Sequence, residues 1–247
     1  MEIVPVTNKT TKKDIAQIKA MGYQISKNNK QGLDTFLNNT FPNLNILKIL
    51  ITLEQCFTHT TQKTIVRNIL FDESSEVLVI DYNNDTYDED EAAVFVREFK
   101  KIKSSIEVEH KYCILPKEFR GKGLIKPVFQ ESLQQYINSN VKKIIVIAGL
   151  SNGGYTWAKH GFRATEKIDM DIILKNAKHQ LKPTEFTVVE KIYLGYYAKY
   201  PNGKSFPINA WATLDFMKPI LIGSVWNGEL NLKNKRHLNK YSEYVYR

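Results

Sequence analysis

The chain is poor in cysteine and has no long apolar run. Its 247 residues include two cysteines, Cys56 and Cys113, which lie far apart and form no CxxC pair. This argues against a disulfide framework and against a zinc site, and both thiols are predicted to be buried small hydrophobes. No segment approaches the roughly 20 apolar residues that span a bilayer, and residues 1–10 lack the basic-then-apolar order of a secretory signal. We therefore expect a soluble cytoplasmic protein without a membrane partner.

The chain also has fewer acidic than basic residues. It contains 26 Asp and Glu and 35 Lys and Arg, and its formal charge is +9. Such a surface suits a nucleic acid or a phosphorylated cofactor, and it suits solubility equally well. The excess is uneven: residues 83–92 carry five carboxylates and no cation, whereas residues 231–247 carry five Lys or Arg and one Glu. Nucleic acid is thus a possible partner but not the favoured one. The acidic stretch is expected to be a solvated hairpin, or else to receive a cationic substrate.

Hydrophobic periodicity changes along the chain. Residues 11–60 are predicted to be helical, with apolar residues at spacings of three or four in 11–25 and a long apolar segment in 44–57. Short β-branched segments follow and predict an antiparallel meander over 64–71, 76–82, 92–102 and 106–116. In the segment 106–116, every second residue is expected to lie on the same face of the strand. That face carries Ile106, Val108, Tyr112 and Ile114.

A strand, turn, helix and strand follow one another in the middle of the chain. Pro116 ends the fourth meander strand because it has no N–H for the ladder. An apolar stripe then predicts a helix over about 123–139, and the run IIVIA predicts a buried strand. This order is that of a βαβ unit.

Beyond this unit, the patterns predict a strand at 167–174, a helix at 183–200 with Thr184 as N-cap, strands around a glycine turn in 220–232, and an amphipathic helix in the last fifteen residues. No repeat or linker is visible. We expect one α+β domain with a mixed, mostly antiparallel central sheet flanked by helices. Its segments would be a helical part (1–60) packed on the core, the core itself (61–178), and a C-terminal part (179–247) that completes or extends it.

The sequence EFRGKG stands where the fourth strand gives way to the helix. Amide N–H groups at a helix start lack intrahelical partners and lie at the positive end of the macrodipole. Glycines let a ligand approach the main chain, and Arg120, Lys122 and Lys126 add full positive charges. A phosphate or pyrophosphate is the natural occupant, although a GxG in a basic stretch also fits a plain tight turn with solvated lysines.

Two familiar phosphate loops are absent, since there is no GxxxxGK[ST] and no GxGxxG that opens a helix after an early strand. What is present is Arg120-Gly121-Lys122-Gly123-Leu124-Ile125. This resembles the acyl-CoA motif [Arg/Gln]-x-x-Gly-x-[Gly/Ala] of the GCN5-related N-acetyltransferases, in the order strand, turn, long helix. The resemblance covers roughly residues 92–175 and includes ILP before the turn, KKIIVIA after the helix, and WAKHGF.

The resemblance implies an N-acyltransferase that uses acetyl-CoA, or another acyl-CoA, on an amine-bearing acceptor. It implies a polarising backbone amide near Ile114 and a base at Glu109 with Glu107 and His110 as rivals. For the acid, Tyr155 is nearby in the sequence and has a suitable hydroxyl, and water can also protonate the thiolate. The cofactor contacts it implies, together with the residues around the turn, are Ile114, Leu115, Arg120, Gly121, Lys122, Gly123, Leu124, Ile125, Lys126 and Asn152.

Each catalytic candidate also has a structural interpretation. Glu107 and Glu109 share a strand face with Lys111, which predicts an exposed ion-pair ladder, and His110 on the other face is expected to be a packed core residue. Trp157 and Gly161 are expected to be a core anchor and a left-handed helix cap.

Two departures from the family pattern bear on activity. Ile125 replaces the final small residue of the motif, and Trp157 stands where many members place a tyrosine acid. The alternative is therefore a catalytically degenerate binding module that contacts nucleic acid or an assembly through its basic surface. An unrelated enzyme with another phosphorylated ligand also remains open.

Overall fold

The computed structural model describes residues 4–26, 30–58, 60–61, 63–86, 88–150 and 152–247. Its architecture is α+β, with a mixed, mostly antiparallel sheet and flanking helices, which confirms the predicted fold class. The chain forms two compact units, one of Met1–Lys143 with Val245–Arg247 and one of Ile144–Tyr244. It passes from the first to the second inside one strand. The predicted segment boundaries after residues 60 and 178 stay predictions.

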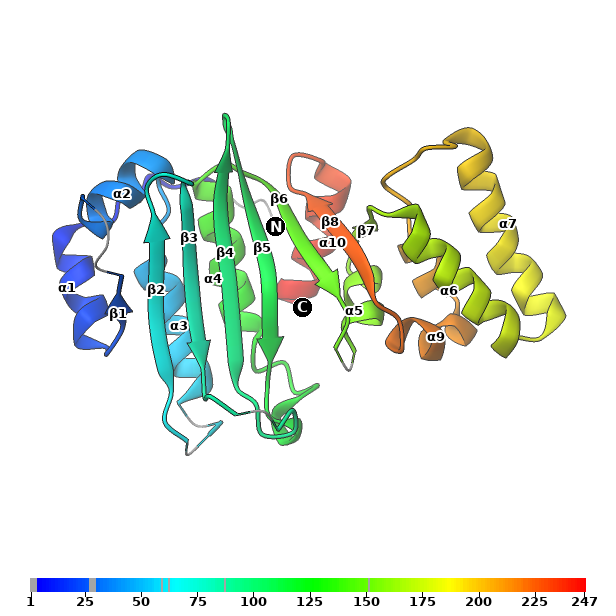
Figure 1. Ribbon diagram of the computed structural model, residues 1–247, viewed down its shortest axis with the longest axis horizontal. Helices are drawn as coiled ribbons and strands as arrows, with labels where there is room; N and C mark the ends of the chain where they lie inside the picture. Colours follow the sequence, from blue (N-terminus) through cyan, green and yellow to red (C-terminus); the bar gives the residue numbers. More distant parts are fainter. Residues whose placement is uncertain (1–3, 27–29, 59, 62, 87, 151) are drawn as a thin grey trace. The chain divides into compact units, whose positions relative to one another are not determined.

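The sheet of the first unit has the strand order β1-β2-β3-β4-β5, and β6 follows β5 (Figure 1). The strands are β1 (Gln24–Ile25), β2 (Val66–Asp72), β3 (Val77–Asn83), β4 (Val94–Ile102), β5 (Ser105–Ile114) and β6 (Val141–Ala148). β1 runs parallel to β2, and β2 to β5 form the predicted antiparallel meander. Ile25 therefore lies in a strand and not, as predicted, in the first helix.

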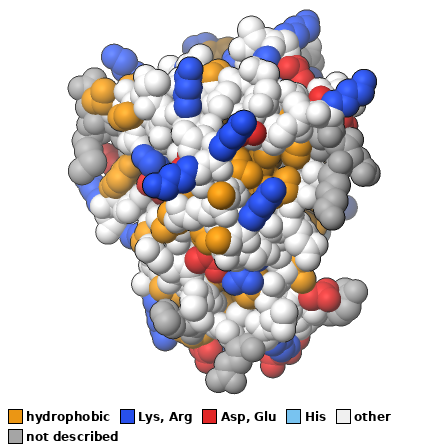
Figure 2. Space-filling view, turned by 90° about the vertical axis from the view of Figure 1, so that its left-hand side faces the viewer, with side chains coloured by type: hydrophobic (Ala, Val, Ile, Leu, Met, Phe, Trp, Pro, Cys, Tyr) orange, Lys and Arg blue, Asp and Glu red, His pale blue; other side chains and the backbone are white. Residues whose placement is uncertain are grey.

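Helices cover one face of this sheet. These are α3 (Ile46–Phe57) and α4 (Lys126–Asn138), which Figure 1 shows behind β2–β5, while α1 (Lys12–Ala20) and α2 (Leu33–Thr40) lie beside the β1–β2 edge. Alternate strand residues such as Ile80, Phe99 and Val108 point into the core beneath them and are fully buried. On the face that carries α1, Lys and Arg side chains stand scattered among neutral and apolar ones (Figure 2).

A β-bulge interrupts the pairing of β4 and β5. Val96 faces Tyr112 and Arg97 faces His110, so Lys111 has no partner across the ladder. One extra residue exchanges the two faces of a strand. Tyr112 is consequently half exposed, and the prediction that it shares a face with Ile106 and Val108 is wrong.

The helix after the glycine turn begins later than predicted. α4 starts at Lys126, three residues beyond Gly123, with Ile125 as N-cap and Pro127 at its second position. Proline suits the first turn of a helix, where N–H groups have no intrahelical acceptor. Residues 120–125 are thus a turn in their own right rather than the first turn of α4.

The second unit contains the rest of the helices and a short pair of strands. Its elements are α5 (Gly153–Lys159), β7 (Arg163–Ala164), α6 (Lys167–Gln180), α7 (Pro183–Lys199), α8 (Asn209–Ala212), α9 (Lys218–Ile222), β8 (Trp226–Asn231) and α10 (Lys235–Tyr246). β8 lies between β6 and β7 in the strand order, and it pairs antiparallel with β7. Aromatic side chains of α7 and α8, such as Tyr197 and Trp211, pack on Phe206.

Two predicted strands of this unit are wrong in whole or in part. Residues 167–174 form the start of α6, and residues 220–232 contain the end of α9 followed by the single strand β8. α7 and α10 confirm the two predicted helices, although the N-cap of α7 is Lys182 and not Thr184. Gly161 has the expected left-handed conformation after α5, with a φ of 95°.

Substitution of two helical glycines, one tightly packed and one open to solvent, tests the packing of the second unit. A Cβ on Gly154 would collide with the carbonyl oxygen of Leu221 and lie 2.7 Å from that of Ser224, whereas a Cβ on Gly195 would meet no atom within 4 Å. Gly154→Ala is expected to lower the free energy of unfolding by about 2–3 kcal/mol through overpacking. Gly195→Ala should raise it by about 0.5–1 kcal/mol, because alanine is the better helix former. Denaturant unfolding measures both, and equal effects would contradict this packing.

Candidate functional site

The glycine turn holds its backbone in an unusual conformation. Gly121 and Gly123 both have a φ of 74°, whereas Arg120 before them is extended (φ −68°, ψ 146°) and Ile125 after them is right-handed (φ −80°, ψ −9°). Successive backbone N–H groups in a turn conformation can form a concavity that binds an anion. Among the described residues, no acceptor is found for the backbone N–H groups of residues 121–125.

Space is open above this backbone. A Cβ on Gly121 would meet nothing within 4 Å, and one on Gly123 would meet only the flexible Lys126 side chain at 3.7 Å. Glycine is needed at both positions for the positive φ rather than for lack of room. An anion can therefore approach the amide groups.

The far end of the turn is fixed to the protein by two hydrogen bonds. The Lys126 N–H donates to the carbonyl of Gly123 at 3.0 Å, and the Cys56 thiol of α3 donates to the carbonyl of Leu124 at 3.0 Å. Burial raises the pKa of Cys56 to about 12, so the thiol stays protonated and can donate at neutral pH. Cys56 is buried as predicted, while Cys113 is only partly so.

The three predicted cations of the site differ in what they contact. The Arg120 guanidinium donates from Nε to the carbonyl of Leu115 at 2.7 Å and from Nη2 to the carbonyl of Glu89, with Asp90 3.9 Å from Nη1. It is thus occupied by the protein. Lys122 is exposed and Lys126 half buried, and neither makes an ion pair within the described part of the chain. These two lysines are the cations left to face a ligand.

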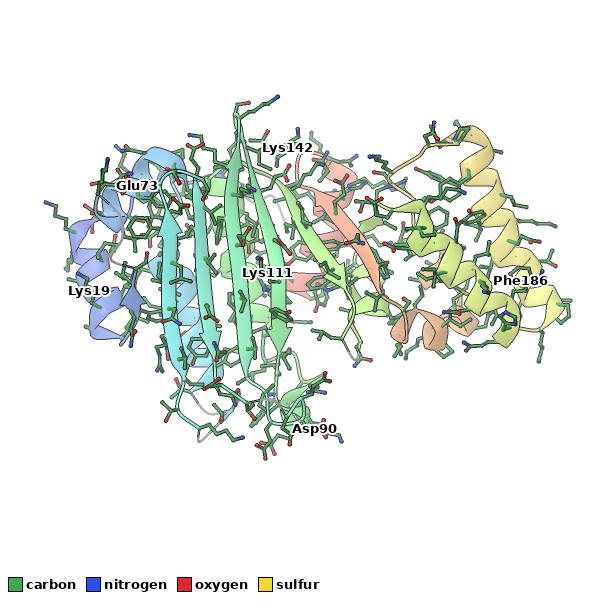
Figure 3. The ribbon with its side chains drawn as sticks, viewed as in Figure 1. Lys19, Glu73, Asp90, Lys111, Lys142 and Phe186 are labelled. Carbon is green, nitrogen blue, oxygen red and sulfur yellow. The ribbon has the colours of Figure 1, made fainter. Side chains whose placement is uncertain are left out.

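The acidic loop between β3 and β4 lies against the turn. Figure 3 labels Asp90 among the loops at the lower end of the strands. A cleft of about 570 Å³ opens beside it, lined by Thr60, Thr61, Lys63, Asp90, Glu91, Pro116, Lys117 and Glu118. Lys63 pairs with Glu91, and Lys117 with Asp90 at 3.0 Å, so most of its charge is balanced internally. The loop is solvated, as the sequence suggested, and these ion pairs also anchor it.

The bulge in β5 lies at Lys111, nine residues before the turn begins at Arg120. Arg97 of β4 is 1% exposed, and its Nη1 donates to the carbonyls of Val96 and Tyr112 at 2.8 and 2.7 Å. Its guanidinium lies 4.0 Å from the Phe95 ring centroid. A bulge leaves backbone groups of the longer strand unpaired. Ile114 and Leu115, predicted to contact the cofactor, follow this irregularity within three or four residues.

Glu107 and Glu109 lie on the sheet face opposite the helices. Lys111, labelled on this face in Figure 3, pairs with Glu98 at 2.6 Å, and Glu109 stands directly opposite Glu98. The hydrogen bond to Glu98, and more weakly the charge of Glu109, raise the pKa of Lys111. The described residues thus contain the ion pair of Lys111 with Glu98 but none of Glu107 or Glu109, so the predicted ladder is present only in part. Whether Glu109 also acts as a base stays a prediction.

His110 points the other way, into the core beneath α4. Its Nε2 lies 3.0 Å from the Tyr136 hydroxyl, and its ring stacks on Phe129 with centroids 6.2 Å apart. Burial, reinforced by the nearby charge of Arg97, lowers its pKa well below the usual value. The packed-core interpretation is confirmed, and a catalytic role for a histidine so enclosed is not supported by its position.

The remaining candidates belong to the second unit. Asn152 is the exposed residue before α5, and Tyr155 lies in α5 with Lys159 and Lys218 over its ring at 5.7 and 5.6 Å. Trp157 packs against Phe162 with ring centroids 4.9 Å apart, as expected of an anchor. The roles of Asn152 and Tyr155 at the turn stay predictions.

Sequence reasoning missed Asp90, Arg97 and Cys56 as partners of the turn and the strand before it. The bonds that reveal them join residues far apart in the chain. A lone arginine in an apolar, alternating strand was the one available signal, because a buried charge must find acceptors.

Comparison of the chain with protein-family models, with curated proteins and with solved structures gives no match. Within the described residues, no helix is long and apolar enough to cross a bilayer. The same residues hold no group of three or more His, Cys, Asp or Glu side chains that could bind a metal.

The buried His110 predicts a specific acid sensitivity. Because its folded-state pKa is depressed below that of the unfolded chain, the folded protein binds fewer protons, and stability is complete above about pH 7. As the pH falls below 6.5, stability is expected to fall by up to about 1.4 kcal/mol per pH unit from this group. His110→Gln should flatten this slope, whereas the exposed His179→Gln should leave it unchanged. Denaturant unfolding between pH 7.5 and 5 measures it, and parallel slopes in all three proteins would refute the assignment.

Proposed function

We propose that the protein is an acyl-CoA-dependent N-acyltransferase, with acetyl-CoA the favoured donor and a primary amine as acceptor. The observation that carries the proposal is the turn at residues 120–125, where two left-handed glycines leave a row of unbonded N–H groups between β5 and α4. Such a concavity suits the pyrophosphate of CoA. Lys122 and Lys126 add full positive charges, which a site made of backbone N–H groups alone does not have.

The reaction places defined demands on the neighbouring residues. The neutral amine attacks the thioester carbonyl, a C–N bond forms, the C–S bond breaks, and the thiolate of CoA leaves. A base must take a proton from the ammonium beforehand, and a backbone N–H must stabilise the oxyanion. In the proposal, Glu109 serves as base and the N–H of Ile114 or Leu115 as donor. The nitrogen loses its second proton to solvent as the amide forms, and the thiolate accepts a proton from water.

The bulge at Lys111 supports this arrangement. It shifts the register of β5 by one residue shortly before the proposed donors, so Ile114 turns to the opposite sheet face from Ile106 while it stays paired with Val94 of β4. The ion pair between Lys111 and Glu98, which stands opposite Glu109, argues in the other direction, because it makes Glu109 part of a charged strand face that needs no catalytic role to explain it. Cofactor binding is therefore the better supported half of the proposal.

The alternative, a nucleic-acid-binding module, has less support. The basic C-terminal segment forms α10, whose Tyr241 and Val245 side chains are buried, so it is packed rather than a free cationic arm, although Lys233, Lys235 and Arg236 are exposed. The scattered cations of Figure 2 form no stripe on that face. Steeply salt-dependent binding to DNA or RNA would reverse this preference.

Two isosteric substitutions test cofactor binding. Gly123→Asn and Gly123→Asp place side chains of the same shape in a left-handed position that both residues tolerate. The carboxylate should weaken CoA binding at least about tenfold more than the amide, because it repels the pyrophosphate at close range. Isothermal titration with CoA and acetyl-CoA measures this. Absence of wild-type binding at millimolar ligand would reject the proposed function.

The base is tested separately from the cofactor site. Glu109→Gln is expected to leave CoA affinity within about twofold and to slow acyl transfer by roughly 10²-fold or more, the usual contribution of a general base. Glu107→Gln, on the same strand face, is the matched control and should retain the wild-type rate. CoA release from acetyl-CoA with a panel of amines provides the assay. Equal rates in both variants would remove Glu109 from the mechanism.

A further inference from the structure

We propose that Asp90 is the positioning residue of the glycine turn, so that the acidic loop strengthens anion binding despite its charge. The inference rests on the proposed function for its ligand, and its structural half can be tested without any ligand. It assigns a role to a loop that sequence reasoning regarded as a solvated hairpin or as a receptor for a cationic substrate.

Asp90 holds the beginning of the turn through both its backbone and its side chain. Its carbonyl accepts the Lys117 N–H at 2.8 Å, and its Oδ2 lies 3.0 Å from Lys117 Nζ. Its Oδ1 is 3.9 Å from Nη1 of Arg120, whose Nη2 donates to the neighbouring carbonyl of Glu89. These contacts fix the residues immediately before the two glycines.

The loop that presents Asp90 is itself ordered from within. Asn84, which is 3% exposed, joins the two ends of the loop. Its backbone N–H donates to the Ala93 carbonyl at 3.1 Å, and its side-chain Oδ1 accepts the Ala93 N–H at 3.0 Å. Its Nδ2 donates to the Glu91 carbonyl at 2.9 Å. The Asp88 side chain accepts the Asp90 N–H at 2.9 Å. Asp90 is thus held by a preformed support.

A positioning role for Asp90 predicts that removal of its negative charge weakens anion binding. Considered as a charge alone, a carboxylate beside an anion site repels the ligand, so its removal should tighten binding. Considered as a support, the same carboxylate keeps Arg120 and Lys117 in place, and its removal should allow the glycine turn to sample conformations whose N–H groups do not converge. The two interpretations of Asp90 therefore predict opposite changes in affinity.

Asp85 in the same loop is the matched control. Its carboxylate makes no hydrogen bond or ion pair within the described chain, and its φ of 45° suits asparagine equally well. Asp85→Asn and Asp90→Asn remove the same charge from the same loop. Only the second substitution disturbs contacts to the turn.

The first experiment is titration of both variants with CoA and with inorganic pyrophosphate at 0.15 M salt. Asp90→Asn is expected to bind both ligands at least about fivefold more weakly than wild type, and Asp85→Asn equally well or slightly more tightly. Asp90→Glu, which keeps the charge and can reach the same cations, should recover at least half of the loss. Unchanged or tighter binding by Asp90→Asn would overturn the proposal.

The second experiment is amide hydrogen exchange of the ligand-free proteins. Residues 117–126 should exchange faster in Asp90→Asn than in wild type, and at the wild-type rate in Asp85→Asn. Equal exchange in all three proteins would overturn the positioning role whatever the affinity data show. Faster exchange in Asp90→Asn combined with no wild-type binding of CoA or pyrophosphate would support the positioning role and reject the acyl-CoA function.

Discussion

A guanidinium buried without a carboxylate is the constraint around which the core of the first unit is arranged. Arg97 points from β4 into an interior of Phe95, Phe129 and Tyr136, where an isolated charge costs several kcal/mol unless it is hydrogen bonded. Its acceptors among the described residues are the carbonyls of Val96 and Tyr112. A regular antiparallel ladder engages such carbonyls with N–H groups of the neighbouring strand. The irregularity at Lys111 is what lets Tyr112 offer its carbonyl to a side chain.

That single extra residue shapes everything that follows it in β5. Before the bulge the helix-covered face receives Val108 and His110; after it, Cys113 turns inward opposite Phe95 and Tyr112 turns outward. Burial, and less strongly the charge of Arg97, lowers the pKa of His110, whose Nε2 lies beside the Tyr136 hydroxyl. The strand then reaches Pro116 with Ile114 in an orientation that simple alternation from Ile106 does not predict. Arg97 thus influences the approach to the glycine turn without touching it.

The sequence predicted most of the first unit because its strands follow local patterns. Alternation in β2 to β4 and the apolar run of α3 decide their own structure. The strand predicted at 167–174 failed because Ile168, Met170 and Ile172 alternate like a strand, whereas the buried residues of α6 are Met170, Ile173 and Ala177 at helical spacing. Pro127 carried the information that α4 starts at Lys126, since proline favours the first turn of a helix. The bulge and the anchoring of the acidic loop depend on tertiary contacts, which no local pattern contains.

Some cations of the candidate site hold the protein together and others are left to face a ligand, and the amino-acid composition does not distinguish the two. The motif EFRGKG suggests that every cation near the glycines faces an anion, yet Arg120 and Lys117 are engaged by Asp90, Glu89 and Leu115. An arginine satisfied by carbonyls and a carboxylate gains little from a further anion, whereas unbonded N–H groups gain a full set of hydrogen bonds. In the proposed site the backbone of residues 121–125 would therefore dominate recognition, and the net charge of +9 would contribute only a diffuse attraction that salt screens. A site of this kind selects ligands by the shape of a phosphate group more than by their total charge. That distinction separates a phosphorylated cofactor from a nucleic acid bound through a basic surface.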